Sequence, residues 1–196
     1  MQLVRNSPVA IGALDAIYAR FAVRSYLDQA VSYENLHALL KAAVRAPTAM
    51  HAEPWAFVVV EKKDILKRLS DHAKIMMKDE ENKLHPKSDN KISDHTPPEN
   101  LFYNAPALII IYGKGKGEFV AADCWLAAEN LMLSAYAMGL GTCVIGSSVS
   151  ALNTSEWKKE FGVGDDMAAI APIIVGLPSK QQEPTSRKEP RILLWS

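Results

Sequence analysis

Three short runs of β-rich apolar residues constrain the fold of this chain more than any other feature. They are Ala56–Val60 (AFVVV), Ala107–Tyr112 (ALIIIY) and Ala168–Gly176 (AAIAPIIVG). The first has the composition of a buried strand. Helical patterns alternate with these runs, but the connections between them are irregular in length. That pattern favours an α+β or α/β layered fold with a central sheet.

Apolar spacing and capping residues predict five helices. Ser32 is a plausible N-cap, and Leu36, Leu39 and Leu40 recur behind it at helical spacing. The five helices are expected at Pro8–Ala19, from Ser32 to about Arg45, from Lys63 to about Met77, from about Glu118 to Met138, and from Asn153 or Thr154 to Phe161. A short extended piece, TCVIG, and a terminal run with β character, RILLWS, complete the pattern.

Composition suits one domain over residues 1–196 and argues against nucleic acid and membranes as partners. The polar segment 78–100 is predicted to be a surface excursion or lid within that domain. Lys plus Arg and Asp plus Glu number 22 each, so no global field attracts nucleic acid or an anionic membrane. The longest apolar stretch, Phe119–Met138, contains Asp123 and Glu129 and is therefore predicted to be a core helix rather than a membrane span.

Cysteine, histidine and glycine patterns exclude several kinds of site. Cys124 and Cys143 lack metal-ligand spacing, and two thiols without a signal-peptide pattern favour a reducing, cytoplasmic setting. The histidines other than His51 also lack ligand spacing and are predicted to be solvated surface residues, so no metal site is expected. The run GKGKGE lacks the spacing of a phosphate-binding loop and is predicted to be a turn.

Two features remain as candidates for a binding site. Arg20 and Arg24 bracket the segment RFAVR, where two guanidiniums could converge on one anion, although a pair of ordinary surface arginines is the alternative. The loop RAPTAMHAEPW, residues 45–55, concentrates two prolines, a threonine, a histidine and a tryptophan between a helix and a strand. A plain connector needs fewer special residues, so this loop is predicted to hold something.

Taken together, the ordered segments resemble the nitroreductase family of FMN-dependent reductases. The segments that carry the resemblance are RFAVRSY, RAPTAMHAEPWAFVVV, NAPALIIIYG, NLMLSAYAMGLGTCVIG, IVGLP and the late Arg187. They cover nearly the whole chain. The resemblance implies an α+β fold with a mixed central β-sheet flanked by helices, and an intertwined homodimer with two FMN sites at its interface, each built from both subunits.

The resemblance also implies which residues bind the cofactor. Arg20, Arg24 and Arg187 would hold the FMN phosphate, with Phe21 and Ala22 standing where the family usually has Arg and Ser. Pro47 would let the backbone turn beneath the ring, and residues 48–53, Thr48 and His51 among them, would present polar groups to its pyrimidine edge. The turn Val144-Ile145-Gly146-Ser147 would lie against the ring, with a backbone N–H of Gly146 or Ser147 near flavin N5.

Two loop residues depart from the family pattern. His51 stands where Asn is usual, and Glu53 where Gln is usual. A histidine can still donate to a flavin carbonyl, whereas an ionised glutamate cannot donate and would oppose charge on a reduced ring. We therefore expect His51 to face the pyrimidine edge and Glu53 not to contact it directly.

The implied activity is ping-pong hydride transfer. NADH or NADPH would reduce flavin N5 and leave, and an electron-poor acceptor such as a nitroaromatic or quinone would then be reduced in its place. The flavin carries the chemistry, so no side chain is predicted to be an obligatory acid or base. The alternatives are another flavin reaction on the same scaffold (dehydrogenation, dehalogenation or flavin breakdown) and a non-catalytic FMN carrier or sensor.

Overall fold

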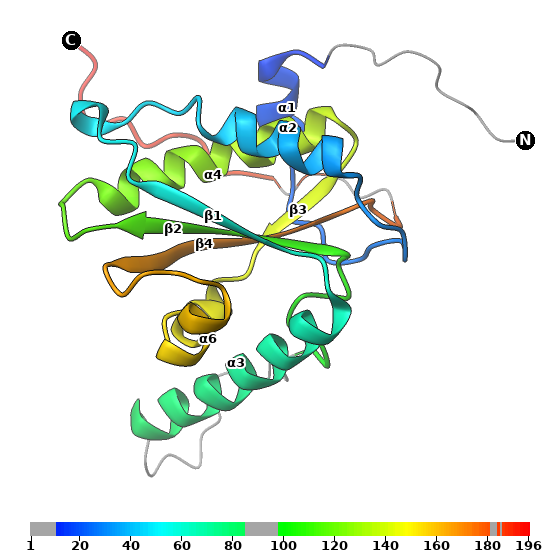
Figure 1. The fold of residues 1–196 in the computed structure, drawn as a ribbon. Helices are drawn as coiled ribbons and strands as arrows, with labels where there is room; N and C mark the ends of the chain where they lie inside the picture. Colours follow the sequence, from blue (N-terminus) through cyan, green and yellow to red (C-terminus); the bar gives the residue numbers. More distant parts are fainter. Residues whose placement is uncertain (1–10, 85–97, 181–183, 185) are drawn as a thin grey trace, which may run out of the picture.

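The computed structural model describes residues 11–84, 98–180, 184 and 186–196, and a four-stranded sheet forms its centre. The strands are β1 (Trp55–Val60), β2 (Ala107–Lys114), β3 (Gly141–Val144) and β4 (Met167–Gly176), in the spatial order β1-β2-β4-β3 (Figure 1). Every neighbouring pair is antiparallel. The prediction of a mixed sheet is therefore wrong for the described residues, where parallel pairing is limited to one bridge, between Ala22 and Thr142.

The three β-rich runs all form strands, but the first does not form the buried strand that its composition suggested. Within the part of the chain that the structure describes, β1 lies at an edge of the sheet and pairs with β2 alone. Within β1 only Val60 is buried, and Val59 is exposed. In contrast, β2 and β4 lie in the middle of the sheet, and nearly all their residues are buried. An apolar run indicates that one or both faces of a strand are buried. Whether the strand lies at the edge or in the middle of the sheet depends on which distant strands pair with it.

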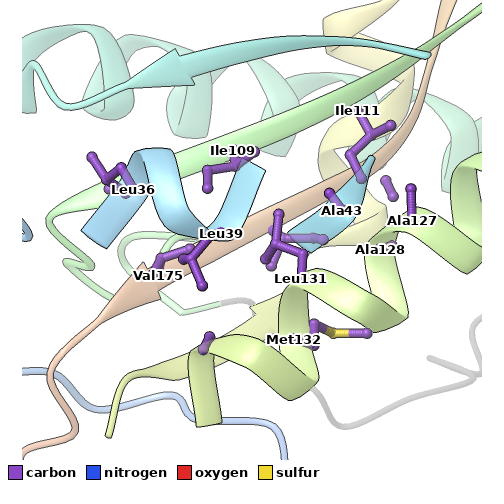
Figure 2. Packing of buried hydrophobic residues seen from close by; sticks show 14 of the residues in the cluster. Leu36, Leu39, Ala43, Ile109, Ile111, Ala127, Ala128, Leu131, Met132 and Val175 are labelled. Carbon is purple, nitrogen blue, oxygen red and sulfur yellow. The ribbon is translucent and has the colours of Figure 1, made fainter. Parts of the chain in front are cut away.

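One face of the sheet is covered by α2 (Tyr33–Ala43) and α4 (Val120–Ala137), and α1 (Ala13–Ala19) packs on α4 on the same side (Figure 1). Figure 2 shows Leu36 and Leu39 of α2 and Leu131 of α4 packed over Ile109 and Val175 of the sheet. Small residues of α4, including Ala127 and Ala128, line the same core and bring that helix close to the sheet. Together these side chains form the larger hydrophobic interior on this face.

The opposite face is covered by α3 (Lys63–Leu84), α5 (Val149–Leu152) and α6 (Ser155–Glu160). Trp157 of α6 and Phe102 are almost completely buried there against alternate residues of β2, among them Tyr112. Burial raises the pKa of the Tyr112 phenol to about 12. The alternation of β2 residues between the two cores is what a central strand covered on both faces requires.

Several boundaries differ from those predicted. The first helix begins at Ala13, with Gly12 as its N-cap, whereas residues 8–10 lie outside the described residues. α3 continues to Leu84, so the polar segment predicted as an excursion begins inside a helix, and residues 85–97 of that segment lie outside the description. The short helices η2 (Gly146–Ser148) and α5 were not predicted. The described tail, residues 186–196, contains no strand.

Candidate functional site

The segment that carries the two N-terminal arginines runs alongside β3 and the end of β4. Arg20 is the C-cap of α1, where its backbone N–H donates to Ala16. Beyond it, the N–H of Val23 donates to the carbonyl oxygen of Thr142 at 2.9 Å. The N–H of Ser179 then donates to the carbonyl oxygen of Ser25 at 3.0 Å. These bonds bring the arginine segment next to residues 179–180, which follow the Gly-Leu-Pro motif of residues 176–178.

A cavity of about 490 Å³ opens beside this junction. It is lined by Ile11, Arg20, Phe21, Val23, Tyr136, Gly139, Leu140, Gly141, Thr142, Leu177, Pro178, Ser179 and Lys180. Arg20 supplies a mostly buried guanidinium, with 22% of its side chain exposed, and its Nε lies 3.5 Å from Oε1 of Glu129. Two cations and a hydroxyl group lining one cavity form a donor set that suits a phosphate.

Close backbone packing shapes the wall of this cavity at Gly141. A Cβ added at Gly141 would lie 2.6 Å from a Val23 methyl group, which is closer than side chains can approach. The absence of a side chain at Gly141 therefore allows the arginine segment to lie directly on β3. This explains the glycine at the first position of β3 as a packing requirement.

Arg24 is more exposed than Arg20 and adds a second positive charge near β3. Burial raises the pKa of the Cys143 thiol, and the nearby guanidiniums of Arg24 and Arg20 offset part of that increase. Both arginines therefore act electrostatically on one point of β3. Ala22, between them, pairs with Thr142 and contributes backbone rather than a polar side chain.

The loop between α2 and β1 lies at the other end of α4. The backbone N–H of Ala49 donates to the carboxylate of Asp123, at 3.2 Å and 3.3 Å to its two oxygens. Met50, His51 and Glu53 have left-handed backbone conformations, with φ values of 53°, 54° and 42°. The side chains of all three are exposed, so the loop presents an unusual backbone shape to its surroundings.

The turn after β3 exposes a backbone segment at the surface. Ile145 is buried, and its N–H donates to the carbonyl oxygen of Pro172 at 2.9 Å. Gly146 is exposed, and a Cβ added there would meet nothing within 4 Å. Val144 and Ser147 are half-buried on either side of that pair. The turn is thus anchored by Ile145 and open to a flat ligand at Gly146.

The residues predicted from the sequence therefore fall into separate groups within one chain. Arg20 and Phe21 line the cavity, whereas Pro47, Thr48 and His51 lie on the loop at the other end of α4. Asp123 at the loop and Tyr136 at the cavity are thirteen positions apart on α4, about 20 Å along the helix, whereas Glu129, the partner of Arg20, is six positions from Asp123, about 9 Å. Arg187 lies in the exposed tail.

Sequence reasoning missed several residues that the structure places in these groups. Ser179 and Lys180 follow the Gly-Leu-Pro motif directly, and a small hydroxyl followed by a lysine was the available signal. Asp123 and Glu129 were visible as the acidic residues of an otherwise apolar helix. Their partners, Ala49 and Arg20, are far away in sequence and could not be inferred.

The histidines do not form a metal site in the part of the chain that the structure describes. No group of three or more His, Cys, Asp or Glu side chains there could hold a metal ion. His72, however, is not the solvated surface residue that was predicted. Its Nδ1 accepts a hydrogen bond from the indole N–H of the buried Trp157 at 2.8 Å. Among the helices of the described residues, none has the length and apolar character to cross a membrane.

Comparison with known proteins identifies the family to which this geometry corresponds. The model of the nitroreductase family matches residues 17–176. A relative from Archaeoglobus fulgidus, provisionally named NADH dehydrogenase/NAD(P)H nitroreductase, is 24% identical over 175 residues, which cover 87% of each chain. The iodotyrosine deiodinase of Thermotoga neapolitana is 26% identical over 132 residues, covering 65% of this chain and 70% of that protein.

The fold is also similar to that of a solved structure. The crystal structure of a nitroreductase with bound FMN from Bacteroides fragilis superposes with a TM-score of 0.76 at 25% sequence identity. The match covers 94% of this chain and 98% of the other. The similarity therefore extends over the sheet, the helices on both its faces and the segments that carry the candidate site.

Proposed function

The chain belongs to the nitroreductase family, and from that premise we propose that it is an FMN-dependent oxidoreductase. It takes a hydride from NADH or NADPH and delivers it, in a ping-pong cycle, to an electron-poor acceptor such as a nitroaromatic or a quinone. The observation that carries the proposal is the cavity beside Arg20, where Ser179 and Lys180 add donors suited to a phosphate. The FMN bound in the Bacteroides fragilis relative supports the choice of cofactor.

The chemistry of these donors fits FMN. Arg20 and Arg24, with Arg187 from the tail, would bind the phosphate, and the hydroxyl of Ser179 and the ammonium of Lys180 would add to them. The open backbone at Gly146 would admit the ring edge, where an N–H donor can act on a nitrogen that gains electrons. When bound, FMN supplies the two-electron chemistry, and the chain supplies binding, orientation and access.

The proposed site requires two copies of the chain. Tyr136, which lines the cavity, and Asp123, which contacts the loop of residues 47–51, lie about 20 Å apart along α4, and we assign the cavity and the loop to different cofactors, as the resemblance to the family implies. In the proposed homodimer, each FMN has its phosphate held by one subunit and its ring covered by the loop of the other. Exposed apolar side chains on α1 and α4 support such an assembly, among them Leu14, Ile17 and Leu126.

The first test is to release the chromophore of the purified protein and identify it by mass, and then to measure NAD(P)H oxidation with a panel of acceptors. Arg20→Ala and Arg187→Ala should each weaken FMN binding about tenfold or more, because each removes a charge-assisted phosphate contact worth about 1.5–3 kcal/mol. Glu129→Gln is the matched control. It also breaks the Arg20–Glu129 ion pair but leaves the guanidinium in place, so FMN affinity should be retained.

Two results would count against this assignment. Unchanged FMN affinity in both arginine variants would remove those residues from the site. An equal loss of affinity in Glu129→Gln and Arg20→Ala would show that Arg20 acts through its ion pair with Glu129 rather than through the phosphate.

Reductive dehalogenation is the second candidate function. The similarity to the iodotyrosine deiodinase of Thermotoga neapolitana favours it over other reactions of this scaffold. A halogenated phenol in the acceptor panel separates the two, because dehalogenation releases halide whereas nitro reduction does not. A protein that binds FMN but turns over no acceptor would instead be a carrier or sensor.

A further inference from the structure

Asp123 is a buried carboxylate in an otherwise apolar part of α4. It lies in the first turn of that helix and only 4% of the residue is exposed. Its neighbours Cys124, Ala127 and Ala128 are completely buried. Aspartate is rarely buried to this degree unless it is paired, because removing its charge from water is costly. The partner of this carboxylate therefore indicates what the residue does.

That partner is the loop between α2 and β1. The N–H of Ala49, 74 residues away in sequence, donates to Oδ1 at 3.2 Å and is 3.3 Å from Oδ2. The position of Asp123 in the first helical turn further stabilises its negative charge, because the helix N-terminus is the positive end of the dipole. An ionised acceptor forms a stronger hydrogen bond than a neutral one.

The loop needs such an anchor because its own side chains do little to maintain its shape. Met50, His51 and Glu53 all have positive φ, a conformation that side chains with a Cβ disfavour. Met50 is 95% exposed, and the other two are also exposed, so packing does not compensate. The N–H of Glu53 lies 3.4 Å from Oγ1 of Thr48, a long hydrogen bond inside the loop itself. The contact with Asp123 ties the loop to the rigid core.

We infer that Asp123 is a positioning residue, which holds residues 48–53 in the conformation that they present to the flavin ring. The inference rests on the proposed function, since the loop is there assigned to the ring of the partner subunit's cofactor. Asp123 acts through the Ala49 N–H and does not contact the cofactor itself. Its charge strengthens the anchor, and the oxygen acceptor is its essential part.

The test compares Asp123→Ala, Asp123→Asn and Asn130→Ala. Asparagine keeps an oxygen acceptor without the charge, whereas alanine leaves the Ala49 N–H without one. Asn130 is the matched control, because it lies on the same helix and its side chain donates to the carbonyl oxygen of Ala42 at 3.4 Å, in α2 rather than in the loop. Three quantities are measured: hydrogen exchange at Ala49 in the apoprotein, the Kd for FMN and the thermal unfolding temperature of the apoprotein.

In Asp123→Ala, exchange at Ala49 should accelerate at least tenfold and the Kd for FMN should rise about tenfold, whereas Asp123→Asn should stay within about threefold of wild type in both. Asn130→Ala should change neither quantity, even if its unfolding temperature falls equally. Unchanged exchange at Ala49 in Asp123→Ala would overturn the inference, as would FMN binding no weaker than in Asn130→Ala. If the wild-type protein bound no FMN, the proposed function would fail, and the exchange measurement would still decide whether Asp123 orders the loop.

Discussion

We predict that each FMN site combines the cavity of one subunit with the 47–51 loop of the other. The perturbation is a pair of variants, one in the cavity and one in the loop. Arg20→Ala removes the guanidinium of the cavity, which should weaken FMN binding about tenfold. His51→Pro destroys the loop conformation, because proline fixes φ near −65° whereas His51 has a φ of 54°. Each homodimeric variant should therefore lack FMN sites of wild-type affinity.

A mixed dimer of the two variants should regain one site. If each site combines the cavity of one subunit with the loop of the other, one site of the mixed dimer carries both substitutions and the other carries neither. Co-expression with two different affinity tags isolates this species. Titration of the apoprotein, followed by flavin fluorescence, should then give about one FMN of wild-type affinity per mixed dimer, compared with two per wild-type dimer.

The outcome separates the two possible arrangements of the site. If cavity and loop of the same chain served one cofactor, each site in the mixed dimer would carry one substitution and none would have wild-type affinity. A mixed dimer without a tight site, formed from variants that remain folded and dimeric, would refute the two-chain assignment.

Two further predictions concern stability. His72→Ala should lower the free energy of unfolding by about 1–3 kcal/mol, because the buried indole N–H of Trp157 loses its acceptor, and His72→Gln should recover part of that loss in urea titrations. Burial raises the pKa of the Cys124 thiol from 9.0 to about 11. The thiol therefore ionises first in the unfolded chain as pH rises, and between pH 8 and pH 12 the wild type should lose roughly 3 kcal/mol more stability than Cys124→Ala does. Equal losses would contradict this reasoning.

Features of the fold that depend on local sequence could be predicted from it. Ser32 caps α2 as expected, with its hydroxyl oxygen accepting from the N–H of Asn35, because capping involves residues three positions apart. The three β-rich runs form strands for a similar local reason. The antiparallel arrangement and the edge position of β1 could not be read in the same way, since both depend on which distant strands pair.

The candidate site, like the fold, could be predicted only in the features that depend on local sequence. The types of residue in RFAVR and in the 45–55 loop pointed to anion binding and to a special loop, because charge and backbone restriction are visible in single residues. The contacts that join these segments to the core could not be predicted from the sequence. Asp123 and Ala49 are 74 residues apart, and Ser179 meets Ser25 across 154. Such contacts exist only once the sheet has formed, so neither could have been named from the chain alone.

In the proposed homodimer, assembly and FMN binding would use the same elements, and each would therefore depend on the other. α1 ends at Arg20, and the tail that carries Arg187 ends in exposed apolar residues, with Trp195 86% exposed. Among the described residues β1 has no partner on its outer edge, and a tail from a second copy could add a strand there. Deleting residues 191–196 should therefore weaken dimerisation and FMN retention together, as measured by sedimentation and by flavin released on dilution. Added FMN should partly restore the dimer, because a ligand that binds only the assembled form stabilises it. A truncated chain that stays a flavin-loaded dimer would show that the tail serves neither purpose.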